Sequence, residues 1–120
     1  MFNFERLDAW RESVCFAEKV YGILRAFPPE ERYGLSGQMR RAVISISSNI
    51  AEGCSRSSTS DYARFVEIAS GSLFEVVSQA AVAIRLGYLT EEDSISIYRD
   101  AERIGKMLSG LRKSLRDKLS

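Results

Sequence analysis

Residues Leu35–Gly53 read LSGQMRRAVISISSNIAEG, and the apolar side chains in this stretch recur at intervals of three and four. These side chains are Leu35, Met39, Ala42, Val43, Ile46 and Ile50. Such spacing is typical of an amphipathic helix that buries one face. Ser36 is a favourable N-cap for this helix, and Gly53 is a favourable residue just beyond its C-terminus. The stretch therefore predicts a helix with one buried stripe.

Three further segments, residues 7–24, 62–84 and 97–119, show the same spacing, and no segment reads as a strand. Pro28 and Pro29 end the first segment because proline lacks the amide donor of a helix. Short links favour antiparallel neighbours. The sequence therefore predicts an all-α fold, an antiparallel up-down-up-down four-helix bundle in which residues 1–120 form a single domain. The expected caps are Ser58 or Thr59 and Thr90, and Gly87 is expected to end the third helix.

Three of the predicted helices carry apolar residues away from the core stripe when positions are projected at about 100° per residue. In the first helix the core stripe is read as Leu7, Trp10, Val14, Ala17, Tyr21 and Leu24. Large contiguous apolar surfaces usually mark interaction sites, so we expect a second face for self-association. Its predicted residues are Phe16, Ile23, Ile44, Ala51, Phe74 and Ala81. The alternative is that wide stripes fill the core. The fourth helix is expected to lack such a face.

Gly71 lies inside the third predicted helix, where glycine costs about 1 kcal/mol relative to alanine. We therefore expect the second and third helices to approach closely at this residue. If the turn between them centres near Arg56, Ala42 lies near Gly71, and Ile46 lies near Val66.

The composition argues against catalysis. Histidine, the usual general base near neutral pH and the commonest metal ligand, is absent. Cys15 and Cys54 are too far apart for a zinc-ligand spacing, and no phosphate-binding loop of the GxxxxGK[ST] type occurs. The serines of residues 45–53 lack the adjacent base that a nucleophile needs. We expect a protein that is not an enzyme and has no catalytic residue, cofactor, metal site or small-molecule substrate.

The net charge is +1, but residues 99–120 hold seven basic and three acidic side chains. These cations either favour the dipole at a helix C-terminus or contact an acidic partner such as nucleic acid. Arg40 and Arg41 can bind phosphate bidentately. The interpretation that we favour is that they pair with carboxylates across helices or subunits, those of Glu52, Glu67 or Glu75. The candidate polar or nucleic-acid contacts are Arg40, Arg41, Arg99, Arg103, Lys106 and Lys113.

No apolar run approaches the roughly 20 residues of a membrane helix, and the polar N-terminal stretch does not read as a signal peptide. We therefore expect a cytoplasmic protein with no membrane contact.

Three motifs resemble one protein family: F-x-x-L-x-x-W at residues 4–10, the stretch Phe27–Gly53, and ASGSLFE at residues 69–75. The family is that of bacterial four-helix-bundle proteins, which includes the proteins encoded by intervening sequences of large-subunit ribosomal RNA genes. More distantly it includes the accessory variability proteins of diversity-generating retroelements. The resemblance implies a homopentamer, in which five bundles form a barrel around a central channel. It implies no catalytic residue.

The retroelement relatives are strongly basic and bind nucleic acid and a reverse transcriptase, whereas this chain is almost neutral. Two functions therefore follow from the resemblance and the composition. The first is a non-enzymatic homopentameric binding or scaffold protein for RNA, DNA or a nucleic-acid-handling partner such as a reverse transcriptase. The alternative is a purely structural or protein-binding oligomer with no nucleic-acid role.

Overall fold

Helices account for every regular element of the computed structural model, which describes residues 1–119. The four α-helices are α1 (Asp8–Leu24), α2 (Leu35–Cys54), α3 (Thr59–Arg85) and α4 (Glu91–Leu119). Two short 3-10 turns, η1 (Asn3–Arg6) and η2 (Pro29–Glu31), precede α1 and α2. The described residues contain no strand, so the predicted all-α class is confirmed.

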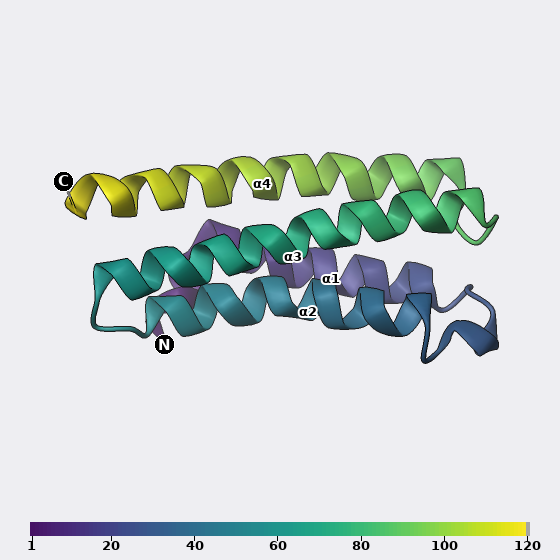
Figure 1. Ribbon diagram of the computed structural model, residues 1–120, viewed down its shortest axis with the longest axis horizontal. Helices are drawn as coiled ribbons and strands as arrows, with labels where there is room; N and C mark the ends of the chain where they lie inside the picture. The colour runs from purple at the N-terminus through teal and green to yellow at the C-terminus, as the bar shows by residue number, and fades with distance from the viewer. Residues whose placement is uncertain (120) are drawn as a thin grey trace.

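Successive helices run antiparallel along a rod of 47 × 22 × 21 Å (Figure 1). Each helix contacts two others, in the cyclic order α1, α2, α3, α4 and back to α1. The helices therefore stand at the corners of a square, and the predicted up-down-up-down four-helix bundle is confirmed. α1 and α2 form one long side of the rod, and α3 and α4 form the opposite side.

Local capping follows the sequence at three of the helix ends. Ser58 Oγ accepts a hydrogen bond from the Asp61 amide at 3.0 Å, and Thr90 Oγ1 accepts one from the Asp93 amide at 3.1 Å. Gly87 follows α3 with a φ of 79°. The amide of Tyr88 donates to the Ala83 carbonyl oxygen, which completes a Schellman motif. These caps were predicted because they depend on residues only a few positions apart.

The ends of α2 differ from the prediction. Ser36 lies inside the first turn, where its Oγ donates to the Glu31 carbonyl oxygen, and Gly34 is the N-cap. The Glu31 carboxylate replaces a serine cap by accepting a hydrogen bond from the Leu35 amide at 2.9 Å. Gly53 lies within α2, which continues to Cys54.

The buried face of α1 agrees with the predicted stripe only in part: Ala17 and Leu24 are buried as predicted. Phe16 is only 1% exposed and packs in the core with Ala9, Val20 and Phe27, whereas Val14 and Tyr21 are exposed. The assignment of Phe16 to an outer self-association face is therefore wrong. α1 has apolar side chains on two faces, and its contacts with α2 and α4 decide which face is buried. Val14 and Tyr21 point outward instead.

The register of α2 against α3 differs from the expected one by about one helical turn. Ser72 Oγ donates to Ser45 Oγ at 2.9 Å, and Ala42 lies beside Glu75 rather than Gly71. Gly71 is exposed, and a Cβ there would meet no atom within 4 Å. The expected close approach of two helices occurs at Gly53 instead.

α3 is a long apolar helix that contacts both α2 and α4. Its 27 residues are long and apolar enough to cross a membrane by length and composition alone. In the bundle it lies between α2 and α4, with Val66, Leu73 and Val76 buried in the shared core (Figure 1). The core therefore accounts for only part of its apolar character, since Ile68, Phe74 and Val82 are exposed.

Candidate interaction surfaces

The outer side of the α3/α4 pair carries an apolar groove. Phe74 is 72% exposed at one wall, and Tyr98 is 56% exposed at the other. Gly105 and Ser78, which are small, keep the groove open between them. The lining residues are Leu73, Phe74, Val77 and Ser78 from α3 and Tyr98, Ala101, Glu102, Gly105 and Lys106 from α4. Two large rings exposed in one hollow are unusual for a surface that faces only water.

The residues predicted for self-association are distributed over both long sides of the rod. Phe74 and Ala81 are exposed on α3, and Ile44 is exposed on α2. Ala51 is half-buried, and Ile23 is half-buried against the core. Because Phe16 is buried, the exposed residues of the predicted set form two separate surfaces rather than one. Their role in self-association stays a prediction.

Two exposed apolar residues on α4 were not predicted from the sequence. Ile95 and Tyr98 are both more than half exposed, so the expectation that the fourth helix lacks an outer apolar face is wrong near its N-terminus. The helical projection could have found them, because Ile95 and Tyr98 lie three residues apart and away from the buried stripe of Ile97, Ala101 and Ile104.

A cationic groove lies on the opposite long side, between α1 and the N-terminal half of α2. It is lined by Tyr21, Arg32, Tyr33, Gly37, Arg40, Arg41 and Ile44. Arg40 Nη2 donates to the Arg32 carbonyl oxygen at 3.3 Å, and the Arg32 guanidinium lies 5.5 Å from the centre of the Tyr33 ring. Within residues 1–119, neither Arg40 nor Arg41 forms an ion pair. We call this feature the arginine groove.

The carboxylates expected to pair with Arg40 and Arg41 lie elsewhere. Glu52 pairs with Arg56 at 3.0 Å, and Glu67 lies 3.9 Å from Arg112. Glu75 lines a shallow groove with Arg41, but no ion pair joins them. The prediction of pairing within the chain is therefore wrong, because Glu52 and Glu67 pair with other arginines and Glu75 lies beside Arg41 without an ion pair. Pairing between copies stays a prediction.

The predicted cations of α4 divide into two groups. Arg99, Lys106 and Lys113 follow one another at seven-residue intervals, are exposed, and form no ion pair in the described part of the chain. Arg103 faces α1 instead. Its guanidinium lies 3.2 Å from Glu12 Oε2 and 3.3 Å from Asp100 Oδ1. Arg103 is therefore part of the bundle and is removed from the candidate nucleic-acid contacts.

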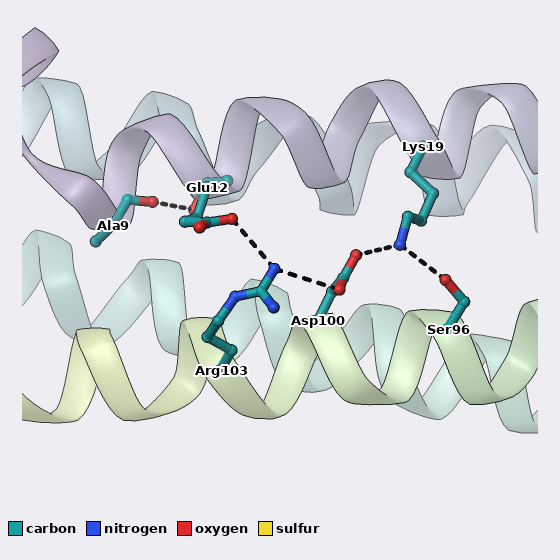
Figure 2. Close-up of polar contacts among 7 residues, drawn as sticks. Ala9, Glu12, Lys19, Ser96, Asp100 and Arg103 are labelled. Carbon is teal, nitrogen blue, oxygen red and sulfur yellow. Dashed lines mark hydrogen bonds and ion pairs between the residues drawn. The ribbon is translucent and has the colours of Figure 1, made fainter.

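Figure 2 shows the polar contacts that join α1 to α4. Lys19 reaches across from α1 to the Asp100 carboxylate and donates to Ser96 Oγ at 2.7 Å. Asp100 also accepts from Arg103, and its side chain is only 14% exposed. The alternating charges of Glu12, Arg103, Asp100 and Lys19 therefore close the bundle between its first and last helices.

Two comparisons identify the relatives of the chain. The sequence profile of the family described as "23S rRNA-intervening sequence protein" matches residues 5–110. This chain belongs to that family. The resemblance inferred from its motifs is thereby confirmed, and the family is one of unknown function. No curated protein matches the chain.

A solved structure of a similar protein has the same fold as this chain. It is a crystal structure of a protein of unknown function from the S23 ribosomal protein family of Bacteroides thetaiotaomicron. The two chains share 27% identity and superpose with a TM-score of 0.81. The match covers 88% of this chain and 95% of the other.

Two tyrosines have raised pKa values. Burial, aided by the neighbouring Cys54 thiol, raises the pKa of Tyr62 to about 12, so its phenol stays neutral and is a weak acid. A hydrogen bond to Glu31 raises the pKa of the Tyr88 phenol as well. Among residues 1–119 no three metal-ligating side chains of histidine, cysteine, aspartate or glutamate converge.

Proposed function

We propose that this chain is a non-enzymatic cytoplasmic scaffold that assembles with copies of itself into a closed ring, a homopentamer. The observation that carries the proposal is that large apolar side chains are exposed on two opposite sides of a bundle whose core is already filled. One is the α3/α4 groove with Phe74, and the other is the α1/α2 surface with Val14 and Ile44. The number five comes from the resemblance to the bacterial bundle family.

The position of the two surfaces favours head-to-tail contact between copies. They lie on opposite long sides of the rod (Figure 1), and they differ in chemistry, since the α3/α4 groove is mostly apolar and the α1/α2 surface includes arginines. When a surface docks on a different surface of the next copy, the contact is heterologous, and repeated contacts close into a ring if the rotation permits. Burial of the exposed apolar side chains supplies the driving force.

Two single substitutions test this arrangement: Ile44→Glu places a charge on the α1/α2 surface, and Phe74→Glu places one in the α3/α4 groove. A glutamate buried without a partner is costly, so each variant alone is expected to be monomeric. Each variant nevertheless keeps one intact surface. An equimolar mixture is therefore expected to form a one-to-one dimer, with twice the mass of the 13.5 kDa chain, measured by light scattering after size exclusion.

Leu86→Glu is the matched control, because Leu86 is exposed at the C-cap of α3 and lines neither surface. This variant should keep the wild-type mass, and all variants should keep their helix content by circular dichroism. A monomeric wild type at micromolar concentration contradicts self-association. Variants that dimerise alone and fail to combine show that each surface pairs with itself, which contradicts the head-to-tail ring.

A second candidate function is binding of RNA, DNA or a nucleic-acid-handling protein such as a reverse transcriptase. The observation that favours it is the line of exposed cations on α4, Arg99, Lys106 and Lys113, none of which forms an ion pair within the described residues. Binding through phosphates weakens as salt rises. A chain that binds no RNA at low salt is instead a structural or protein-binding oligomer.

A further inference from the structure

The arginine groove concentrates positive charge, and within residues 1–119 none of its arginines forms an ion pair, although Glu75 lines a neighbouring groove with Arg41. Three guanidinium groups, those of Arg32, Arg40 and Arg41, line it together with two tyrosines, and none of its lining residues is acidic. Neighbouring guanidinium groups repel one another, and arginines inside a fold are usually compensated by carboxylates. The charge of this groove is therefore available to an external anion.

The carboxylate nearest to Arg32 in the sequence, that of Glu31, accepts hydrogen bonds from other groups. Glu31 Oε1 accepts from the Leu35 amide at 2.9 Å, and Glu31 Oε2 accepts from the Tyr88 hydroxyl at 3.0 Å. Glu30 is exposed and does not line the groove. Both oxygens of Glu31 are thus used to fasten the α1–α2 link to α2 and to the α3–α4 turn, and they are not available to neutralise the arginines.

The backbone around the groove holds its cationic wall in place. Arg40 donates to the Arg32 carbonyl oxygen, so the α2 helix and the preceding link are joined at this point. Gly37 makes the close packing possible, because a Cβ at that position would collide with the same carbonyl group. Ser36 Oγ adds a hydrogen bond to the Glu31 carbonyl oxygen at 2.7 Å. The link that carries Arg32 and Tyr33 is therefore fixed against α2.

An aromatic platform lies beside the cations. Tyr33 is 86% exposed, and the Arg32 guanidinium lies 5.5 Å from its ring centre. Tyr21 contributes a second phenol to the lining. Guanidinium groups bind phosphate oxygens through paired hydrogen bonds, and exposed aromatic rings stack with nucleobases of any sequence. A phosphate ester that carries an aromatic base uses both features together.

We propose that the arginine groove binds a nucleotide unit, with its phosphate on Arg40 and Arg41 and its base stacked on Tyr33. The unit comes from a single-stranded nucleic acid or from a free nucleotide, which present the same chemistry. The inference rests on the nucleic-acid candidate above, which it deepens by naming a second surface. Ile44 lines both this groove and the surface proposed for self-association, so the mass of the assembly is measured together with binding. A neighbouring copy is the less suitable occupant, because the α3/α4 groove offers a single carboxylate, Glu102, beside the cation of Lys106.

The site is tested by fluorescence anisotropy with a labelled single-stranded RNA over a series of salt concentrations. We expect the double variant Arg40→Ala/Arg41→Ala to bind at least about tenfold more weakly. The slope of log affinity against log salt should fall by roughly 1.4, since each phosphate contact to a single strand contributes about 0.7. Tyr33→Leu should weaken binding about 5- to 150-fold and leave the slope unchanged, because stacking releases no counterion.

Arg85→Ala is the control, since Arg85 is exposed on α3, forms no ion pair among the described residues and lies outside the groove. Its binding should match the wild type. Competition by adenosine monophosphate separates the two sources: displacement of the RNA shows that a free nucleotide fits the groove. Arginine-dependent RNA binding without displacement shows that the strand is the ligand. Either result supports the site.

Three results overturn the proposal. One is a wild-type chain that binds neither RNA nor the mononucleotide at low salt, and another is a double variant that binds RNA as the wild type does. The third is a fall in the light-scattering mass of the double variant, which assigns Arg40 and Arg41 to the contact between copies. Since mass and binding are measured on the same samples, failure of this site is distinguished from failure of self-association.

Discussion

Gly53 is a residue at which α2 and α3 approach each other closely. A Cβ at this position would lie 2.7 Å from the Cβ of Phe65 and 3.2 Å from Cδ1 of Tyr62. The Phe65 Cβ is attached directly to the backbone of α3 and cannot rotate away. The same close packing buries the Tyr62 phenol, which raises its pKa. The last turn of α2 therefore needs a residue without a side chain.

We expect Gly53→Ala to lower the free energy of unfolding by about 1–3 kcal/mol, the usual cost of overpacking. This loss exceeds the gain of about 1 kcal/mol in helix propensity. Gly71→Ala is the matched control, because Gly71 also lies within a helix but has open space around its Cα. It should raise the free energy by up to about 1 kcal/mol. Urea unfolding measures both, and equal stability of the two variants contradicts the close approach at Gly53.

The sequence assigned the close approach to the wrong glycine. Gly71 lies inside a predicted helix, and Gly53 was predicted just beyond the end of another, but which of them meets the other helix depends on the register of α2 on α3. That register is set by the four-residue turn and by contacts such as the Ser45–Ser72 hydrogen bond, which join positions 27 residues apart. The displacement leaves Gly71 without a neighbour within 4 Å of its Cβ position, whereas Gly53 meets Phe65 and Tyr62 of α3. Local patterns contain no information on this displacement.

At the scale of the element, α1 shows how far periodicity reaches. The four helices and the caps at Ser58, Thr90 and Gly87 were predictable because they depend on neighbours in sequence. The buried face of α1 was not, because Phe16 and Val14 belong to two equally apolar stripes. Only the positions of α2 and α4 select Phe16 for the core. Arg103 was misplaced for the same reason, since its partner Glu12 is 91 residues away.

The contact between α1 and α4 depends on Asp100, which accepts from Lys19 and Arg103. Asp100→Ala leaves both cations without this partner in a half-buried site. We expect the free energy of unfolding to fall by about 1–3 kcal/mol, measured by urea unfolding. Glu18→Ala removes an exposed acid of α1 that forms no ion pair in residues 1–119. It should change stability by less than about 0.5 kcal/mol. If both variants are equally stable, the polar contacts do not hold α1 to α4.

At the scale of the whole molecule, the rod presents different chemistry on its different sides. The α1/α2 side combines apolar residues with the arginine groove, and the α3/α4 side has the apolar groove. The sequence indicated the exposed members Ile44 and Phe74 and singled out Arg40 and Arg41, although it favoured pairing of these two arginines with carboxylates. It could not assemble them into surfaces, because Arg32 and Tyr21 join the groove only after the α1–α2 link folds back. The composition of each surface is therefore a tertiary property.

The exposed cations of α4 lie in a line along the helix. Arg99, Lys106 and Lys113 are about 10.5 Å apart, since seven residues of helix advance about 1.5 Å each. If nucleic acid lies along this line, Lys106→Gln/Lys113→Gln should reduce the salt slope of RNA binding by about 1.4, without changing the mass of the assembly. Arg25→Gln, which removes an exposed cation of the α1 C-cap, should leave the slope unchanged.

The arginine groove and the line of cations on α4 should contribute separately to the salt dependence of RNA binding. The α4 line and the arginine groove share no residue, so their variants should act additively on log affinity if a strand contacts both. An unchanged slope in the α4 variant, together with a reduced slope in Arg40→Ala/Arg41→Ala, restricts nucleic-acid contact to the groove. An unchanged slope in both variants removes both surfaces from nucleic-acid binding. The two exposed apolar surfaces then leave self-assembly as the function that the fold supports.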